Sequence, residues 1–154
     1  MSKKAVIGLG SLSRRDDAIG IVVLDSLLAL QKTKGIDYLN FGSASIDLIS
    51  RLMDYDKALL IDAIDAGQAC GKLIISDLEK IEYDLNLPAV SSHELNLKDL
   101  FELSKRLGVK TKIYLAGIQI KDVSFGEGLS RELKKKKKEI VRKIALFINN
   151  ELRK

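Results

Sequence analysis

The sequence contains few of the residues that carry several common chemistries. Its 154 residues include one cysteine, one proline, one histidine and no tryptophan. The lone cysteine, Cys70, excludes an internal disulfide, and neither an HExxH motif nor a pair of cysteines offers a familiar zinc site. A serine–histidine–aspartate triad would have to use His93, and no GxSxG motif accompanies it.

Long apolar runs and targeting segments are missing as well. No apolar stretch approaches the roughly 20 residues that a membrane helix needs. The opening segment, MSKKAVIGLG, lacks the apolar core of a signal peptide. Hydrophobic residues nevertheless make up 46% of the chain, which is enough for a substantial core. We therefore expect residues 1–154 to form a single cytoplasmic domain without membrane insertion.

Positive charge is concentrated at one end of the chain. Residues 131–154 hold ten Lys/Arg and three Asp/Glu, whereas the other 130 residues hold sixteen Lys/Arg and eighteen Asp/Glu. Five consecutive lysines, Lys134 to Lys138, dominate this segment. A solvated helix face near a C-terminus would account for them, because the helix dipole favours cations there. An acidic or phosphate-bearing partner is the alternative.

Short apolar runs alternate with segments of helical periodicity, which predicts an α/β fold. The expected strands are 5–9, 37–41, 58–64, 73–75 and 112–120, and the expected helices are 18–30, 46–53 with Ser45 as cap, 91–108 and 128–152. Only residues 65–72 join the third and fourth strands, and a parallel crossover needs about a dozen residues. We predict a three-layer sandwich around a twisted, mostly parallel five-stranded sheet with one antiparallel strand.

The first loop, GLGSLSRRDDAIGI, starts like a nucleotide-binding turn but does not continue as one. Ser13 occupies the third glycine position of the dinucleotide fingerprint, and no GK[ST] follows as in a P-loop. A phosphate at the N-terminus of the next helix would also face Asp16 and Asp17.

Three polar features are expected at the carboxyl edge of the sheet, where sites form in open α/β folds. Asp16 and Asp17 follow the first strand, Asp62 lies near the end of the third, and His93 lies in the first turn of a helix. Two carboxylates and an imidazole suit a divalent transition metal. The alternatives are a helix cap at Asp16 or Asp17, an exposed His93, and an Asp62 bonded to loop amides.

The motifs GLGSLSRRDDAIG, LLIDAID, SSHELNL and GIQI…GEGLS, in this order, resemble those of the hydrogenase maturation endopeptidases. The resemblance implies a phosphorylase/hydrolase-like fold with a twisted sheet between two helical layers. It also implies removal of a C-terminal extension from the large-subunit precursor of a nickel-iron hydrogenase after nickel insertion. In that family the nickel, supplied by the substrate, is bound by residues corresponding to Asp17, Asp62 and His93.

The sequence departs from the family pattern at three places. Ser11 replaces the usual asparagine, and Asp17 replaces a frequent glutamate. The segment 40–43, with Gly42 and Ser43 as expected substrate-binding residues, replaces Asp-Gly-Gly-Thr.

The resemblance implies a catalytic set of Asp16, Asp17, Asp62 and His93. The family is classed with aspartic-type peptidases, but whether the metal or a carboxylate such as Asp16 activates water stays open.

Two other functions compete with the peptidase. One is a non-catalytic α/β protein that binds a metal or a small ligand at the same edge. The other is a nucleic-acid-binding domain using the basic last helix, which would bind in a strongly salt-dependent way and tolerate Asp17→Ala. Under the leading hypothesis the partner is the hydrogenase precursor rather than a nucleic acid, and we expect a monomer.

Overall fold

The computed structural model describes residues 2–30, 32–80 and 97–154, which contain five strands and the helices that cover them. The strands are β1 (Lys4–Leu9), β2 (Ile36–Gly42), β3 (Lys57–Ile64), β4 (Leu73–Asp77) and β5 (Lys112–Gln119). The helices are the 3-10 turn η1 (Arg15–Ala18), α1 (Ile19–Leu30), α2 (Ile46–Leu52), α4 (Leu97–Arg106), α5 (Arg131–Phe147) and the π-helical turn η2 (Ile148–Leu152).

The five strands form one sheet in the order β2-β1-β3-β5-β4. β1 pairs in parallel with β2 and β3, and β3 pairs in parallel with β5. β4 runs antiparallel to β5 at one edge, as the short connection before it predicts. The predicted fold class is therefore confirmed.

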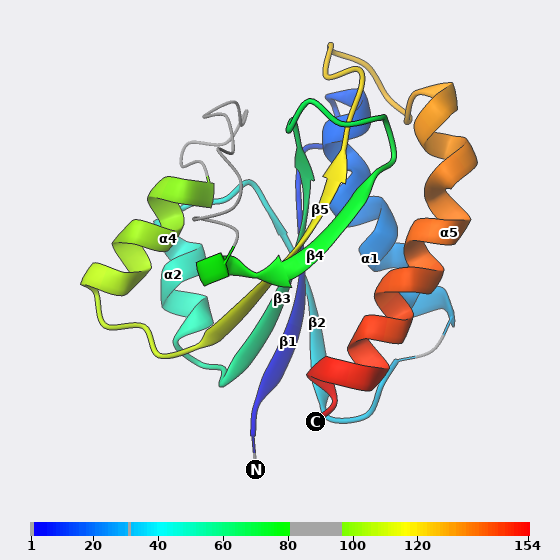
Figure 1. The fold of residues 1–154 in the computed structure, drawn as a ribbon. Helices are drawn as coiled ribbons and strands as arrows, with labels where there is room; N and C mark the ends of the chain where they lie inside the picture. Colours follow the sequence, from blue (N-terminus) through cyan, green and yellow to red (C-terminus); the bar gives the residue numbers. More distant parts are fainter. Residues whose placement is uncertain (1, 31, 81–96) are drawn as a thin grey trace.

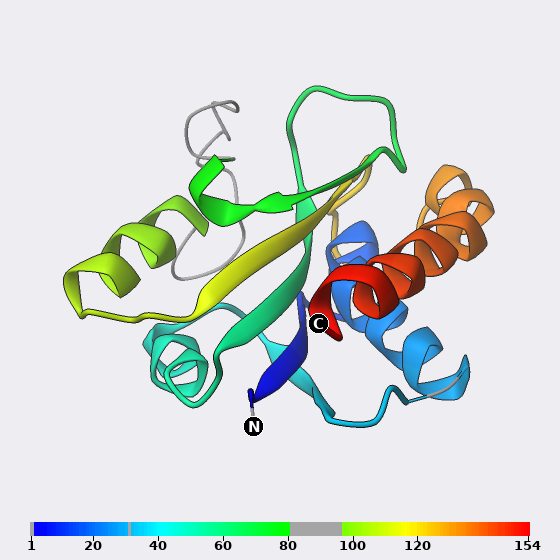
Figure 2. The same ribbon diagram turned by 60° about the horizontal axis from the view of Figure 1, so that its bottom comes forward.

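Helices cover both faces of this sheet, so the central strands β1, β3 and β5 are buried from two sides (Figures 1 and 2). α1 and α5 lie on one face and α2 and α4 on the other. β3, in the middle of the sheet, reads as an almost continuous buried run, which is typical of a parallel strand covered on both sides. No helix among the described residues combines the length and apolarity required to cross a bilayer.

Element ends differ from expectation where a cap or a turn decides them. A 3-10 turn precedes α1, so the α-helix starts one residue later than predicted. Ser45 precedes α2 as predicted, but its side chain makes no capping bond. The closing helix starts at Arg131 rather than 128, because Ser130 caps it by accepting from Leu133 N. The expected start of the helix at Ser91 lies outside the described residues.

Candidate functional site

The carboxyl ends of β1 and β3 lie side by side, and the start of α1 packs directly onto them. Gly8 of β1 is in register with Ile61 of β3. A Cβ atom at Gly20 would lie only 2.2 Å from the carbonyl oxygens of both Leu9 and Ile61. Only glycine allows this approach, so the turn before α1 is held close to the edge where Asp62 follows Ile61.

Asp17 lies in the η1 turn, and its position is fixed by the glycine loop, the turn at Gly10 and Ser11 that follows β1. Gly10 has a φ of 141°, and a Cβ there would lie 2.0 Å from the carbonyl oxygen of Asp17. The Ser11 amide donates a 3.2 Å hydrogen bond to Asp17 Oδ2. Asp17 is only 4% exposed, so this loop brings a buried carboxylate to the strand ends.

Asp62 is a second buried carboxylate at the same edge, with an exposed fraction of 0%. The Ala63 amide donates a 2.8 Å hydrogen bond to its Oδ1 atom. Alternation along β3 puts Asp62 on the same face as Leu60 and Ile64, the face covered by α2 and α4. On the neighbouring strand β5, the residue paired with Asp62 is Gly117, which has no side chain.

Asp16 is also buried, and its carboxylate accepts four hydrogen bonds from the segment after β5. The amides of Lys121 and Asp122 each donate to Oδ2 at 3.0 Å. The Ser130 amide donates to Oδ1 at 2.6 Å, and the Ser130 hydroxyl donates to Oδ2 at 2.8 Å. Asp16 therefore anchors the 121–130 segment to the first loop, while its expected part in activating water stays a prediction.

Further contacts hold the same two loops together. The Arg15 amide donates to the Gly126 carbonyl at 3.1 Å, and the Asp16 amide donates to the Asp122 carbonyl at 2.9 Å. The Arg14 guanidinium carbon lies 4.7 Å from the centre of the Phe125 ring. The 121–130 segment is thus fixed to the residues that directly precede Asp17, a role that sequence alone did not assign to it.

Charged side chains of this segment have pKa values set by local partners. Lys121 Nζ lies 2.6 Å from Glu132 Oε1. This bond raises the pKa of the Lys121 ammonium and lowers the pKa of the Glu132 carboxyl. Hydrogen bonds from the Ser124 hydroxyl and amide lower the pKa of Asp122, which also lies 3.8 Å from Arg15. These groups are ionised at neutral pH and lie beside the candidate site.

The two residues expected to bind substrate lie at the end of β2, with Gly42 as its last residue and Ser43 just after it. The Gly42 carbonyl accepts a 2.9 Å hydrogen bond from the Gly10 amide, and a φ of 69° lets Gly42 turn the chain out of the strand. Ser43 comes next and is exposed. Both residues therefore lie beside the glycine loop, and their contact with substrate stays a prediction.

His93, the third predicted ligand, lies outside the described residues. Within residues 2–30, 32–80 and 97–154, no group of three His, Cys, Asp or Glu side chains could hold a metal ion. The structure thus brings Asp17 and Asp62 to one edge and leaves the predicted triad with His93 untested.

These features define a class: a three-layer α/β protein with buried carboxylates at the carboxyl edge of its sheet. Residues 22–146 match the family of the hydrogenase maturation proteases, and the chain belongs to this family. The matched range contains Asp62 and His93, whereas Asp17 precedes it.

Two solved structures and one curated protein are similar to this chain. The [NiFe] hydrogenase maturation protease HycI from Thermococcus kodakarensis is 28% identical, with a TM-score of 0.75 over 97% of this chain and 94% of that one. The maturating endopeptidase HybD from Escherichia coli is 21% identical and shares the fold, with a TM-score of 0.81 over 96% and 92% of the two chains.

Among curated proteins, the hydrogenase expression/formation protein HupD of Thiocapsa roseopersicina is 25% identical over 85% of this chain. The matched part spans 61% of the length of HupD.

Proposed function

We propose that this protein is an endopeptidase that removes a C-terminal extension from the large-subunit precursor of a nickel-iron hydrogenase once nickel has been inserted. Membership of the hydrogenase maturation protease family supports the reaction class. The observation that carries the proposal is the burial of Asp17 and Asp62 at one edge of the sheet. The expected cytoplasmic location and monomeric state belong to the same proposal.

Nickel enters this proposal as part of the substrate. Carboxylate and imidazole groups are suitable ligands for a divalent nickel ion, and Asp17, Asp62 and His93 would supply them. Burial strengthens the attraction between the two carboxylates and an arriving cation, because charges interact more strongly away from water. A precursor without nickel would lose this attraction and would bind less well.

The chain's own residues would then orient the peptide to be cut. The close approach of Gly10 holds the Asp17 backbone, the Ser11 amide holds the Asp17 carboxylate, and the sheet holds Asp62 in place. Holding a scissile bond in a reactive geometry can lower a barrier by several kcal/mol, on the order of 7–11 in the best cases. Positioning through the metal is thus a sufficient reason for cleavage to depend on nickel.

The test follows the mass of a hydrogenase large-subunit precursor mixed with the purified protein, with and without nickel in the precursor. We expect loss of a C-terminal fragment only from the nickel-loaded form. Asp17→Asn, Asp62→Asn and His93→Ala should abolish cleavage, because each removes one ligand.

Asp54→Asn is the matched control, since Asp54 is an exposed aspartate in the turn after α2. It should cleave like the unsubstituted protein. If several nickel-loaded precursors, including one encoded beside this protein, are bound but never shortened, the peptidase proposal is wrong and a binding-only role replaces it.

A further inference from the structure

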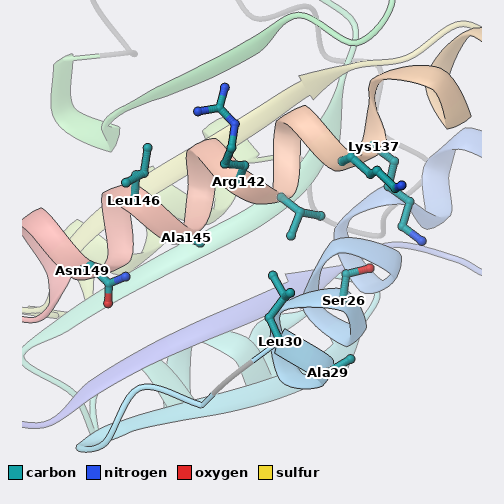
Figure 3. Close-up of a pocket in the computed structure, with 10 residues that line it drawn as sticks. Ser26, Ala29, Leu30, Lys137, Arg142, Ala145, Leu146 and Asn149 are labelled. Carbon is teal, nitrogen blue, oxygen red and sulfur yellow. The ribbon is translucent and has the colours of Figure 1, made fainter.

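A groove runs between α1 and α5, with a volume of about 670 Å³ (Figure 3). Its lining contains none of the predicted site residues. On α5 and the η2 turn that follows it, the lining residues recur every three or four positions from Lys138 to Asn149, and on α1 they are Ser26, Ala29 and Leu30. Residues at this spacing share one side of a helix, so the groove is formed by two facing stripes.

The floor of the groove is apolar and partly open to solvent. Val141 is buried at its base, while Leu30 and Leu146 flank it with exposed fractions of 68% and 51%. The Ser26 hydroxyl donates to the Val22 carbonyl at 3.0 Å and so already has an acceptor. The floor therefore offers apolar area to a partner and few polar groups that would need new hydrogen bonds.

The rim of the groove is basic. Lys137, Lys138 and Arg142 line it, and no acidic side chain belongs to the lining. Among the described residues these three cations make no ion pair, whereas their neighbour Lys143 lies 3.0 Å from Glu139. The lysine run is thus more than a uniformly solvated face, because part of it borders an apolar groove.

We propose that this groove binds an acidic amphipathic helix of a protein partner. Apolar side chains spaced at i, i+3 or i+4 and i+7 would enter the floor, and glutamates or aspartates beside them would meet Lys137, Lys138 and Arg142. From Lys137 to Asn149 the groove follows α5 and the start of η2 for about 18 Å, which is the length of about twelve helical residues. A concave floor favours a helix over a flat membrane surface. The proposal does not depend on peptidase activity.

The probe is a fluorescent 18-residue synthetic peptide with leucines at the helical spacing and glutamates elsewhere. Fluorescence anisotropy should show saturable binding that weakens with added salt, since salt screens exposed charges. A peptide of the same composition in scrambled order should bind at least about tenfold more weakly, because its leucines no longer share one side.

Substitutions on the groove then locate the binding. The double variant Lys137→Glu/Arg142→Glu should weaken binding by roughly tenfold, and Leu146→Ser by a similar factor. Lys134→Glu/Lys135→Glu is the matched charge control, because both lysines are exposed on the same helix but lie outside the lining. Met53→Ser is the matched apolar control, because Met53 is also 51% exposed. Both controls should bind the peptide like the unsubstituted protein.

Three results would overturn the proposal. One is equal binding of the ordered and scrambled peptides. In the second, the peptide does not bind, but the protein is retained on phosphatidylcholine/phosphatidylglycerol vesicles and the Lys137→Glu/Arg142→Glu variant is not. This result would assign the groove to a membrane surface. In the third, the peptide does not bind, but the protein self-associates in analytical ultracentrifugation and the Leu146→Ser variant does not. This result would assign the groove to a second copy of the chain. Precursor cleavage in the same preparations reports on the proposed function separately.

Discussion

Asp16 and Asp17 are neighbours in the chain, yet their carboxylates meet different surroundings. Asp16 accepts hydrogen bonds from Lys121, Asp122 and Ser130, all more than 100 positions away. Asp17 is bonded by Ser11 within its own loop and lies at the ends of the strands. At the scale of single residues, Asp16 holds two loops together, and the adjacent Asp17 is the acid that the proposal assigns to the nickel contact.

Replacing Asp16 tests this division of roles. Asp16→Ala would leave three partly buried backbone amides without this acceptor, and it should lower the free energy of unfolding by about 2–4 kcal/mol. Urea unfolding followed by circular dichroism measures the loss. Asp54→Ala, at an exposed position, should change it by less than about 0.5 kcal/mol. Equal stability of the two variants would show that the Asp16 bonds do not hold the loop.

Cys70 supplies a second prediction at the residue scale. Burial, followed by the negative charge of Asp16, raises the pKa of its thiol. Less thiolate is then present at neutral pH, and the thiolate is the reactive form. Iodoacetamide should therefore modify Cys70 more slowly than free cysteine, and Cys70→Ser should cleave precursor normally. Inhibition by iodoacetamide that Cys70→Ser prevents would contradict both expectations.

At the scale of elements, the contact between α1 and the sheet edge depends on one missing side chain. In an ordinary helix, Gly20→Ala would stabilise by up to about 1 kcal/mol. Here the added methyl would overlap backbone oxygens of β1 and β3, so we expect a loss of about 3 kcal/mol in urea unfolding. Asp25→Ala, exposed on the same helix, is the control and should change stability by less than about 0.5 kcal/mol. A stabilised Gly20→Ala variant would mean that α1 can shift away from the edge.

Local patterns predicted the elements well, because their causes are local. The apolar run of β3 and the short connection before β4 are enough to place both strands. The start of α5 was missed because Ser130, which caps it, was not weighed as a cap. The anchoring of Asp16 could not be predicted, since its partners follow β5 and meet it only in the folded chain. For the site, the sequence predicted that Asp17 and Asp62 lie at the carboxyl edge of the sheet, where the structure has them, but not that the 121–130 segment is bonded to the loop carrying Asp17.

At the scale of the whole molecule, charge is unevenly distributed between the last two helical segments and the rest of the chain. Residues 131–154 carry a formal charge of +7 and the remaining residues −2. Carboxylates placed against cations of this part of the chain, such as Glu139 against Lys143 and Glu151 against Lys154, relieve some of that repulsion. Protonating them in acid removes this relief while every lysine and arginine stays charged.

The free energy of unfolding should therefore fall as the pH is lowered into the acid range. The pKa values of Glu132, Glu139 and Asp122 are lowered from their ordinary values of 4.5, 4.5 and 3.8 by hydrogen bonds that their charged forms accept, chiefly from Lys121, Lys143 and Ser124. A carboxyl with a lower pKa in the folded state binds fewer protons there than in the unfolded state. The carboxyl stabilises the fold fully when the pH is above its pKa in the unfolded state. This stabilisation is lost as the pH falls through its pKa in the folded state.

The urea midpoint, measured at a series of pH values, checks this expectation. It should vary little between about pH 7 and pH 5, and it should fall below about pH 4.5. Glu132→Gln should make the fall smaller, because one of the contributing carboxyls is gone. Glu127→Gln, at an exposed glutamate in the loop before α5, should leave the profile as it is. A midpoint that rises in acid, or an identical profile in both variants, would show that the Lys121–Glu132 bond does not stabilise the junction between β5 and α5.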